Sequence, residues 1–272
     1  MDPVLALVQR INDNKKLRVW SLIITFFGDA VVPRGGAVSA RTAQQLLARM
    51  GIESGTVRTA FSRLCNDEWV VREKIGRSSY YRLSETGTQP FREATDRIYA
   101  PLQADGQATA LQQANGWTLS IARSDYPKIR LERNIPKHRA EQLAADDCLI
   151  VQGEKVHIPN WLKQANTIAG HADSFCTLMQ AFEPIADRQL EPLDALAVRC
   201  LLIHEWRRIL FQFDSVEPAF WPDNWPEGRC HGFVRQLYHH LLPVSEDWLS
   251  QHATAPAGRM DGPQQDLTER FN

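Results

Sequence analysis

Residues 39–83 read SARTAQQLLARMGIESGTVRTAFSRLCNDEWVVREKIGRSSYYRL, and this stretch decides how the N-terminal part of the chain folds. It contains two segments whose apolar residues recur at i, i+3, i+4 and i+7, the spacing of one helix face. Those apolar residues are Ala43, Leu46, Leu47 and Met50 in the first segment, and Val57, Ala60, Phe61 and Leu64 in the second. The spacing predicts two short amphipathic helices, each with one buried face.

Small residues mark the ends of these two helices. Ser39 and Ser54 stand where the helices should begin, and a serine oxygen can accept hydrogen bonds from the free N–H groups of a first turn. Gly51 lies between the helices and can adopt the positive φ that ends a helix. Upstream, residues 20–27 repeat the helical spacing, so three helices are predicted to share a small core.

Two strand-like segments follow the second helix. Residues 69–75 and 78–83 are rich in β-branched and aromatic residues, and Gly76-Arg77 joins them. A two-residue Gly-X loop suits the type II′ turn of a β-hairpin. Two helices around a tight turn, followed by a hairpin, are the pattern of a winged helix-turn-helix, a DNA-binding module.

The outer face of the second helix is predicted to contact DNA. This face carries hydrogen-bonding and cationic side chains, as suits a helix in the major groove, while the hairpin cations are expected to contact phosphate or the minor groove. Arg41 and Arg49, on the first helix, are read as solvated surface residues. The alternative is a helical subdomain that uses the hairpin for protein contact. The predicted DNA-binding residues are Arg58, Thr59, Ser62, Arg63, Lys74, Arg77 and Arg82.

Charge sets this region apart from the rest of the chain. Residues 15–83 contain twelve Lys or Arg and five Asp or Glu, a net charge of +7. The whole chain carries −1, so the remaining residues carry −8. A basic module in an acidic chain suits local phosphate binding better than a general affinity for nucleic acid.

The composition indicates a globular protein of the cytoplasm. The 272 residues suffice for two or three domains, and 43% of them are hydrophobic. Five cysteines, with no CxxC pair, indicate reduced thiols. No signal peptide is expected, because the apolar run over residues 4–8 is short and precedes its charges, and nothing suggests a membrane.

Beyond the hairpin the signals alternate between helix and strand. Residues 90–100 are predicted to form a linking helix, a natural mechanical route between a sensor and a DNA-binding module. Residues 117–122 and 148–162 offer short strands, with a helix-like segment over 136–145 between them. From residue 193 onwards the spacing is helical again.

These segments predict an α+β chain. Its parts are an N-terminal winged helix-turn-helix, a small central α/β domain, a C-terminal helical domain and a polar, disordered tail. The predicted divisions are 15–88 for the DNA-binding domain, 89–113 for the linking helix and connector, 114–183 for the α/β domain, 184–252 for the helical domain and 253–272 for the tail.

No metal or catalytic site is predicted. His204-Glu205 suggests the HExxH motif of metalloproteases, but position 208 is arginine. Cys200 with His204, or His171 with Cys176, could share a metal, although neither has a second matching pair. A buried thiol and a hydrogen-bonded histidine are the preferred interpretation, and no cysteine lies in a nucleophile motif.

Two separate blocks of the sequence resemble the PaaX family of bacterial repressors, which control phenylacetic acid catabolism. The N-terminal block comprises LIITFFGDAVVPRGG (22–36), GTVRTAFSRLCNDEWV (55–70), GRSSYYRLSETG (76–87) and RIYAP (97–101). The C-terminal block comprises LLIHEWRRILF (201–211), WPDNWPEG (221–228) and VRQLYHHLLP (234–243).

The resemblance implies a cytoplasmic, homodimeric repressor that binds a double-stranded operator and is not an enzyme. A symmetric dimer favours a palindromic operator. The resemblance also implies release by an aryl-CoA thioester, typically phenylacetyl-CoA, with no cofactor. The alternative function is an enzyme that acts on an acyl-CoA thioester and is fused to a nucleic-acid-binding module.

A CoA effector needs cations for its phosphates and an apolar pocket for its acyl end. His204, Trp206, Arg207 and Arg208 are the candidate effector-binding residues. The alternative is that the two arginines bridge domains or a dimer interface. Trp221 and Trp225, in a proline-rich loop, are expected to be structural anchors.

Overall fold

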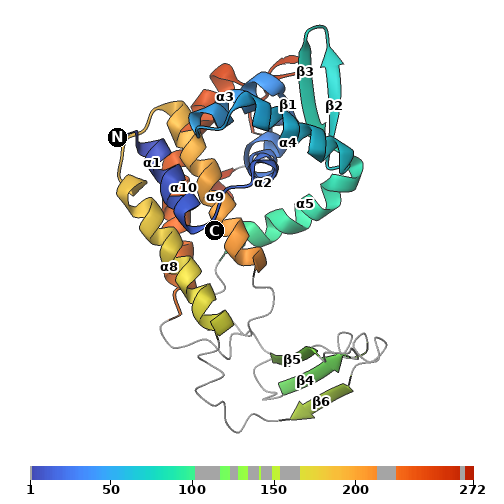
Figure 1. Cartoon of the computed structure of the whole chain (residues 1–272), viewed down its shortest axis with the longest axis vertical. Coiled ribbons are helices and arrows are strands. Elements are labelled where there is room, and N and C mark those ends of the chain that lie inside the picture. The colour runs from blue at the N-terminus through green and yellow to red at the C-terminus, as the bar shows by residue number, and fades with distance from the viewer. Residues whose placement is uncertain are drawn as a thin grey trace. The chain divides into compact units, whose positions relative to one another are not determined.

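The structure is a computed structural model and describes residues 2–101, 117–122, 128–133, 141, 149–153, 166–212, 225–263 and 267–272 (Figure 1). These residues combine helices with small antiparallel sheets, so the chain is of the predicted α+β class. The chain forms two compact units. The first contains residues 1–101, 176–210 and 229–272, and the second contains residues 102–175 and 211–228.

The N-terminal helices are α1 (Pro3–Asn14), α2 (Val19–Phe26), α3 (Ala40–Arg49) and α4 (Ser54–Asn66). The three helices predicted over α2, α3 and α4 are therefore confirmed, while α1 was not predicted. The predicted apolar faces are buried, as Leu46 and Leu64 illustrate with 0% and 1% exposure. After α2 the chain continues into a π-helical turn, η1 (Phe27–Val31), and a 3₁₀ turn, η2 (Val32–Arg34).

The helix ends agree with the prediction in two places and differ in one. Ser39 caps α3, because its Oγ accepts from the Thr42 N–H at 3.1 Å. Gly51 has φ +77, the left-handed conformation that ends a helix. Ser54 does not cap α4. The cap position belongs to Glu53, whose extended backbone leads into the helix without a side-chain hydrogen bond.

The predicted hairpin consists of β2 (Val70–Ile75) and β3 (Ser78–Leu83). Ile75 pairs with Ser78, so the turn contains only Gly76 and Arg77, and Gly76 has the φ of +59 that a primed turn requires. An unpredicted strand, β1 (Ala37–Ser39), pairs with the other side of β3, giving the order β1-β3-β2.

Ring stacking attaches this sheet to α4. The Tyr81 ring lies on Phe61, with 3.9 Å between ring centroids, and Val70 at the start of β2 is buried. Figure 1 shows the tip of the hairpin extending away from the helices of the first unit.

The linking helix α5 (Glu85–Ile98) begins five residues before the predicted start. Its N-cap is Ser84, whose Oγ accepts from the Gly87 N–H at 2.9 Å. Ser84 also donates to the carbonyl of Glu68, two residues beyond the end of α4. The cap at Ser84, directly after β3, makes the helix start where the hairpin ends.

The second unit contains an antiparallel sheet of order β5-β4-β6, formed by β4 (Trp117–Ala122), β5 (Lys128–Arg133) and β6 (Leu149–Gly153). The strands predicted at β4 and β6 are confirmed, and β5 was missed although KIRLER alternates charged and apolar residues. The predicted helix over 136–145, apart from the helical Glu141, and the strand after Gly153 lie outside the described residues.

Three long helices follow, α8 (Asn166–Ala186), α9 (Pro192–Gln212) and α10 (Glu227–His252). Helical structure after residue 193 was predicted, whereas α8 was missed. No described helix has both the length and the hydropathy needed to cross a membrane.

The prediction of a disordered tail over 253–272 is wrong for its described residues. They include β7 (Thr254–Ala255), β8 (Gly258–Arg259) and the 3₁₀ turn η4 (Leu267–Glu269). Phe271 is 1% exposed, and its N–H donates to the Tyr99 carbonyl at 3.0 Å. The polar composition suggested disorder. The structure instead shows contacts between this tail and residues far away in the sequence, such as the bond from Phe271 to Tyr99 and the bond from Arg270 to Asp29.

Candidate nucleic-acid interface

The predicted DNA-binding residues of α4 all lie on its exposed side, which we call the α4 face. It consists of Arg58, Thr59, Ser62 and Arg63. Arg58 has no intramolecular partner among the described residues, so its guanidinium is available to a ligand. Arg63 forms an exposed ion pair with Asp67 at 3.4 Å and lies 5.8 Å from the centroid of the Trp20 ring. Exposed pairs of this kind are weak, so Arg63 could exchange Asp67 for a phosphate or a base.

The hairpin cations Lys74, Arg77 and Arg82 are also exposed, but they do not share one face. Side chains alternate along a strand. Lys74 pairs with Ser79 and so lies on the face that carries Tyr81, which packs on α4. Arg82 points to the opposite face, and Arg77 is at the turn. DNA that meets the α4 side of the hairpin would therefore reach Lys74 more easily than Arg82.

Arg72 was not predicted as a DNA contact, although it is exposed on the same hairpin face as Lys74. Its Nη2 donates to Ser79 Oγ at 2.7 Å, which holds the guanidinium against β3. The sequence contained a signal for this grouping, because Arg72 and Lys74 are two positions apart in a predicted strand and such residues lie on the same face.

The first-helix arginines have different environments. Arg41 is exposed, as predicted. Arg49 is not a solvated surface residue: its Nη2 donates to Asp194 at 2.8 Å and its Nη1 lies 2.9 Å from Asp2. Hydrogen bonding to Asp194 raises the pKa of Arg49. The side chain therefore joins α3 to the first turn of α9.

The four candidate effector residues are separated by their positions around α9. His204 and Trp206 are buried, and Trp206 Nε1 donates to the Ile98 carbonyl at the end of α5. His204 Nδ1 lies 3.2 Å from Thr25 Oγ1, and burial lowers the pKa of His204 to about 3. Arg208 pairs with Glu205 on the same helix. Of the four, Arg207 alone lines the cavity of about 90 Å³ that lies between α2, α5 and α9.

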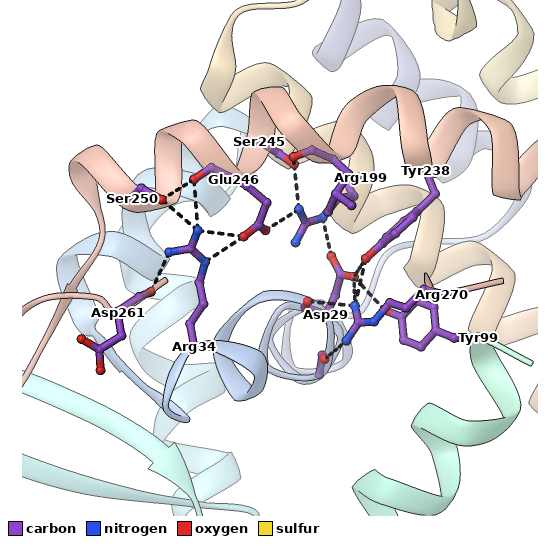
Figure 2. A network of polar contacts seen from close by, with 12 residues as sticks. Asp29, Arg34, Tyr99, Arg199, Tyr238, Ser245, Glu246, Ser250, Asp261 and Arg270 are labelled. Carbon is purple, nitrogen blue, oxygen red and sulfur yellow. Dashed lines mark hydrogen bonds and ion pairs between the residues drawn. The ribbon is translucent and has the colours of Figure 1, made fainter. Parts of the chain in front are cut away.

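A buried ion network joins the N-terminal and C-terminal parts of the first unit (Figure 2). We call it the Asp29 network. Asp29 accepts from Arg199 Nε at 2.6 Å, from Arg270 Nη1 at 2.9 Å and from the Tyr99 hydroxyl at 2.7 Å. Burial acts to raise the pKa of Asp29, but the cations Arg199 and Arg270 outweigh it and the pKa is lowered. Sequence reasoning missed this network completely.

The Asp29 network continues along α10. Glu246 accepts from Arg199 Nη1 at 2.7 Å and forms an ion pair with Arg34 Nη2 at 2.7 Å. Arg34 is 1% exposed and also donates to the Asp261 carbonyl at 2.7 Å. The network therefore ties η1, η2, α9, α10 and the C-terminal residues together.

The described residues contain no group of three or more His, Cys, Asp and Glu side chains that could hold a metal ion. Cys200 Sγ lies 4.0 Å from the Leu22 carbonyl, whereas His204 contacts Thr25. Burial raises the pKa of the Cys200 thiol, so it is protonated at neutral pH.

Comparisons with known proteins agree with the two-block resemblance. A family model described as PaaX-like protein matches residues 18–87, and a second, described as PaaX-like protein C-terminal domain, matches residues 167–251. The transcriptional repressor PaaX of Escherichia coli (strain K12) is 24% identical over 286 aligned positions, which cover 92% of this chain and 89% of that protein. The structure of the uncharacterized protein Rv0674 from Mycobacterium tuberculosis covers 77% of this chain and 91% of its own, with 14% identity and a TM-score of 0.46.

Proposed function

The chain belongs to the PaaX family, and on that premise we propose that it is a transcriptional repressor whose residues 37–83 bind operator DNA as a winged helix-turn-helix. In this proposal α4 lies in the major groove, where arginine can bind guanine edges, and the hairpin contacts the sugar-phosphate backbone.

The α4 face is the observation that carries the proposal. Its four polar side chains are exposed together on the side of α4 opposite the buried Val57 and Phe61. The guanidinium of Arg58 has no intramolecular partner among the described residues, and the hairpin adds the exposed cations Lys74 and Arg77. Exposed cations on a helix and its neighbouring strands are the arrangement that phosphate and base contacts require.

Three further features of the proposal follow from the family. The repressor acts in the cytoplasm as a homodimer, so two α4 helices would meet a palindromic operator whose half-sites lie one helical turn, or a multiple of it, apart. The operon it controls serves catabolism of an aromatic acid of the phenylacetate type. An aryl-CoA thioester releases the repressor, which requires that the effector binds the DNA-free state more tightly than the DNA-bound state.

The enzyme alternative finds no activated thiol in Cys200 or Cys65. Burial raises the pKa of both Cys200 and Cys65, whereas a nucleophilic cysteine needs a lowered pKa. We therefore expect no release of free thiol when the protein is incubated with an aryl-CoA.

A titration of the full chain against DNA from its own upstream region tests the proposal. We expect binding that is about 10³-fold or more tighter than to a scrambled duplex of the same length, and that weakens steeply with salt. The scrambled duplex controls for charge alone. Equal affinity for both duplexes would refute operator recognition, and absence of binding to either would refute the DNA-binding role.

A further inference from the structure

The cavity between α2, α5 and α9 belongs entirely to the first unit. Its wall is mostly apolar, with Ile24 from α2, Phe91 and Ile98 from α5, and Ile203 from α9. An engineered cavity of about 150 Å³ holds one benzene molecule. At about 90 Å³, this cavity suits one small apolar group after a slight shift of its wall, and it excludes a whole nucleotide.

Arg207 supplies a cation at this apolar wall. Its Nη2 donates to the carbonyl and the hydroxyl of Ser21, at 3.2 and 2.5 Å. No carboxylate among the described residues pairs with Arg207, and burial lowers its pKa. Asp29 also lines the cavity, but its carboxylate already forms ion pairs with Arg199 and Arg270.

A partly buried cation without a counter-charge is costly. A ligand carboxylate at Arg207 would supply the missing counter-charge, and a carbonyl oxygen would offset part of the cost through a hydrogen bond. The apolar part of the same ligand would fill the space beside Phe91 and Ile98.

We infer that this cavity binds a compact, apolar acyl group, with the carboxylate or thioester oxygen of the ligand directed at Arg207. The inference rests on the proposed function, because it locates the site of the effector. A free aryl carboxylate and its CoA thioester share the apolar group and a carbonyl oxygen, although only the carboxylate carries a charge. In the thioester the nucleotide part would remain outside the cavity.

The cavity wall is directly connected to the candidate nucleic-acid interface. Trp69 lines the cavity and stands immediately before β2. Its carbonyl accepts from the Ser84 N–H at 3.1 Å, so the same residue also fixes the start of α5. A group that enters the cavity would thus press on the base of the hairpin and on the linking helix together.

Close packing limits how the wall can adapt to a ligand. A Cβ at Gly28 would lie only 2.8 Å from Cε1 of Phe91, so the Phe91 ring rests directly on the backbone of η1. Entry of a ligand is therefore expected to move the Phe91 ring or α5 away from η1. Such movement is a physical basis for different ligand affinities in the DNA-bound and DNA-free states.

Calorimetric titration of the full chain without DNA tests the site, with phenylacetate, phenylacetyl-CoA and CoA as probes. Ala94→Leu fills the cavity from α5, and Arg207→Gln removes the cation. We expect each to weaken binding of the acyl probes about tenfold or more, because overpacking and loss of a charged hydrogen bond both have costs of that order. Arg207→Lys should restore part of the affinity. Arg92→Gln, an exposed arginine of α5, is the matched control and should bind like the unchanged protein.

The outcomes separate the site from the DNA-binding proposal. The inference is supported if the protein binds phenylacetate, phenylacetyl-CoA or both, and if Ala94→Leu and Arg207→Gln lose this binding. The probe that binds then identifies the source of the acyl group. Unchanged affinity in both variants, equal binding of CoA and its thioester, or no binding of any probe would overturn it. Thermal unfolding checks that each variant folds. If Arg207→Gln does not fold, the affinity of Ala94→Leu alone decides the result. DNA titration of the unchanged protein without ligand tests the repressor function independently.

Discussion

The α4 face and the Asp29 network are both built around arginines, yet they use them in opposite ways. Arg58 on the α4 face is exposed and has no intramolecular partner in the part of the chain that the structure describes. Arg199 in the Asp29 network is 0% exposed and pairs with both Asp29 and Glu246. Residue type alone therefore does not identify a DNA contact. Burial and pairing decide whether an arginine stabilises the protein or is available to a partner.

Breaking the Asp29 network should produce the largest effect. Asp29→Ala leaves Arg199 and Arg270 buried without their main counter-charge, so we expect a loss of about 3–5 kcal/mol in the free energy of unfolding. Chemical denaturation measures it. Asp67→Ala removes the exposed partner of Arg63 and should change stability by less than about 1 kcal/mol. Equal effects of the two substitutions would contradict the contrast between the buried and exposed pairs.

The stability of the buried region should also depend on pH. The pKa of His204 is lowered to about 3 by burial, and it rises towards 6.5 when the chain unfolds. The unfolded state therefore binds more protons between these values, and stability falls as the pH is lowered from about 6.5 towards 3. From pH 6.5 to pH 5 the loss attributable to His204 should be about 2 kcal/mol.

His204→Gln tests this origin of the pH dependence. The difference in unfolding free energy between pH 7 and pH 5, measured by chemical denaturation, should be smaller for the variant than for the unchanged protein. His240→Gln, at an exposed position on α10, is the matched control. A pH dependence that persists fully in His204→Gln would show that other groups cause it.

Removing Arg58 should affect DNA binding and leave the fold intact. We expect Arg58→Ala to lose about 1–3 kcal/mol of affinity for the cognate operator if the guanidinium contacts a base. Its thermal stability should stay unchanged, because no described residue bonds to the side chain. Arg41→Ala, at an exposed position on α3, is the control. An equal loss on cognate and scrambled DNA would identify Arg58 as a phosphate contact.

The smallest predicted effect separates the two faces of the hairpin. Lys74→Ala should weaken binding to all sequences and reduce the slope of affinity against salt by about 1, as expected for one phosphate contact. Arg82→Ala, on the opposite face, should change that slope less. The reverse order would show that DNA approaches from the side of the hairpin that faces away from α4.

Local signals in the sequence sufficed for much of the first unit. The spacing of Leu46 and Leu64 predicted α3 and α4, and Gly76-Arg77 predicted a two-residue hairpin turn. These features depend on residues within a few positions of each other, and so they are readable along one segment. Strand β5 was missed although its alternation was present, and α8 was missed because its segment was assigned to the central domain.

Long-range contacts explain the failures at Arg49 and in the tail. Arg49 was read as a surface residue because its partner Asp194 is 145 positions away. The tail was read as disordered because the partner of Arg270 is Asp29, 241 positions earlier. Neither pair of residues follows a helical or strand spacing, so the sequence gives no pattern from which the pairing could be predicted.

The sequence by itself determined the helices and hairpin of residues 39–83, their exposed cations and the family of the chain, because spacing, turn residues and local charge are properties of short segments. The tertiary structure alone decided which arginines are buried beside Asp29 and Glu246 and which single effector candidate, Arg207, lines the cavity. Those assignments depend on burial and on partners from distant segments, which exist only once the chain has folded.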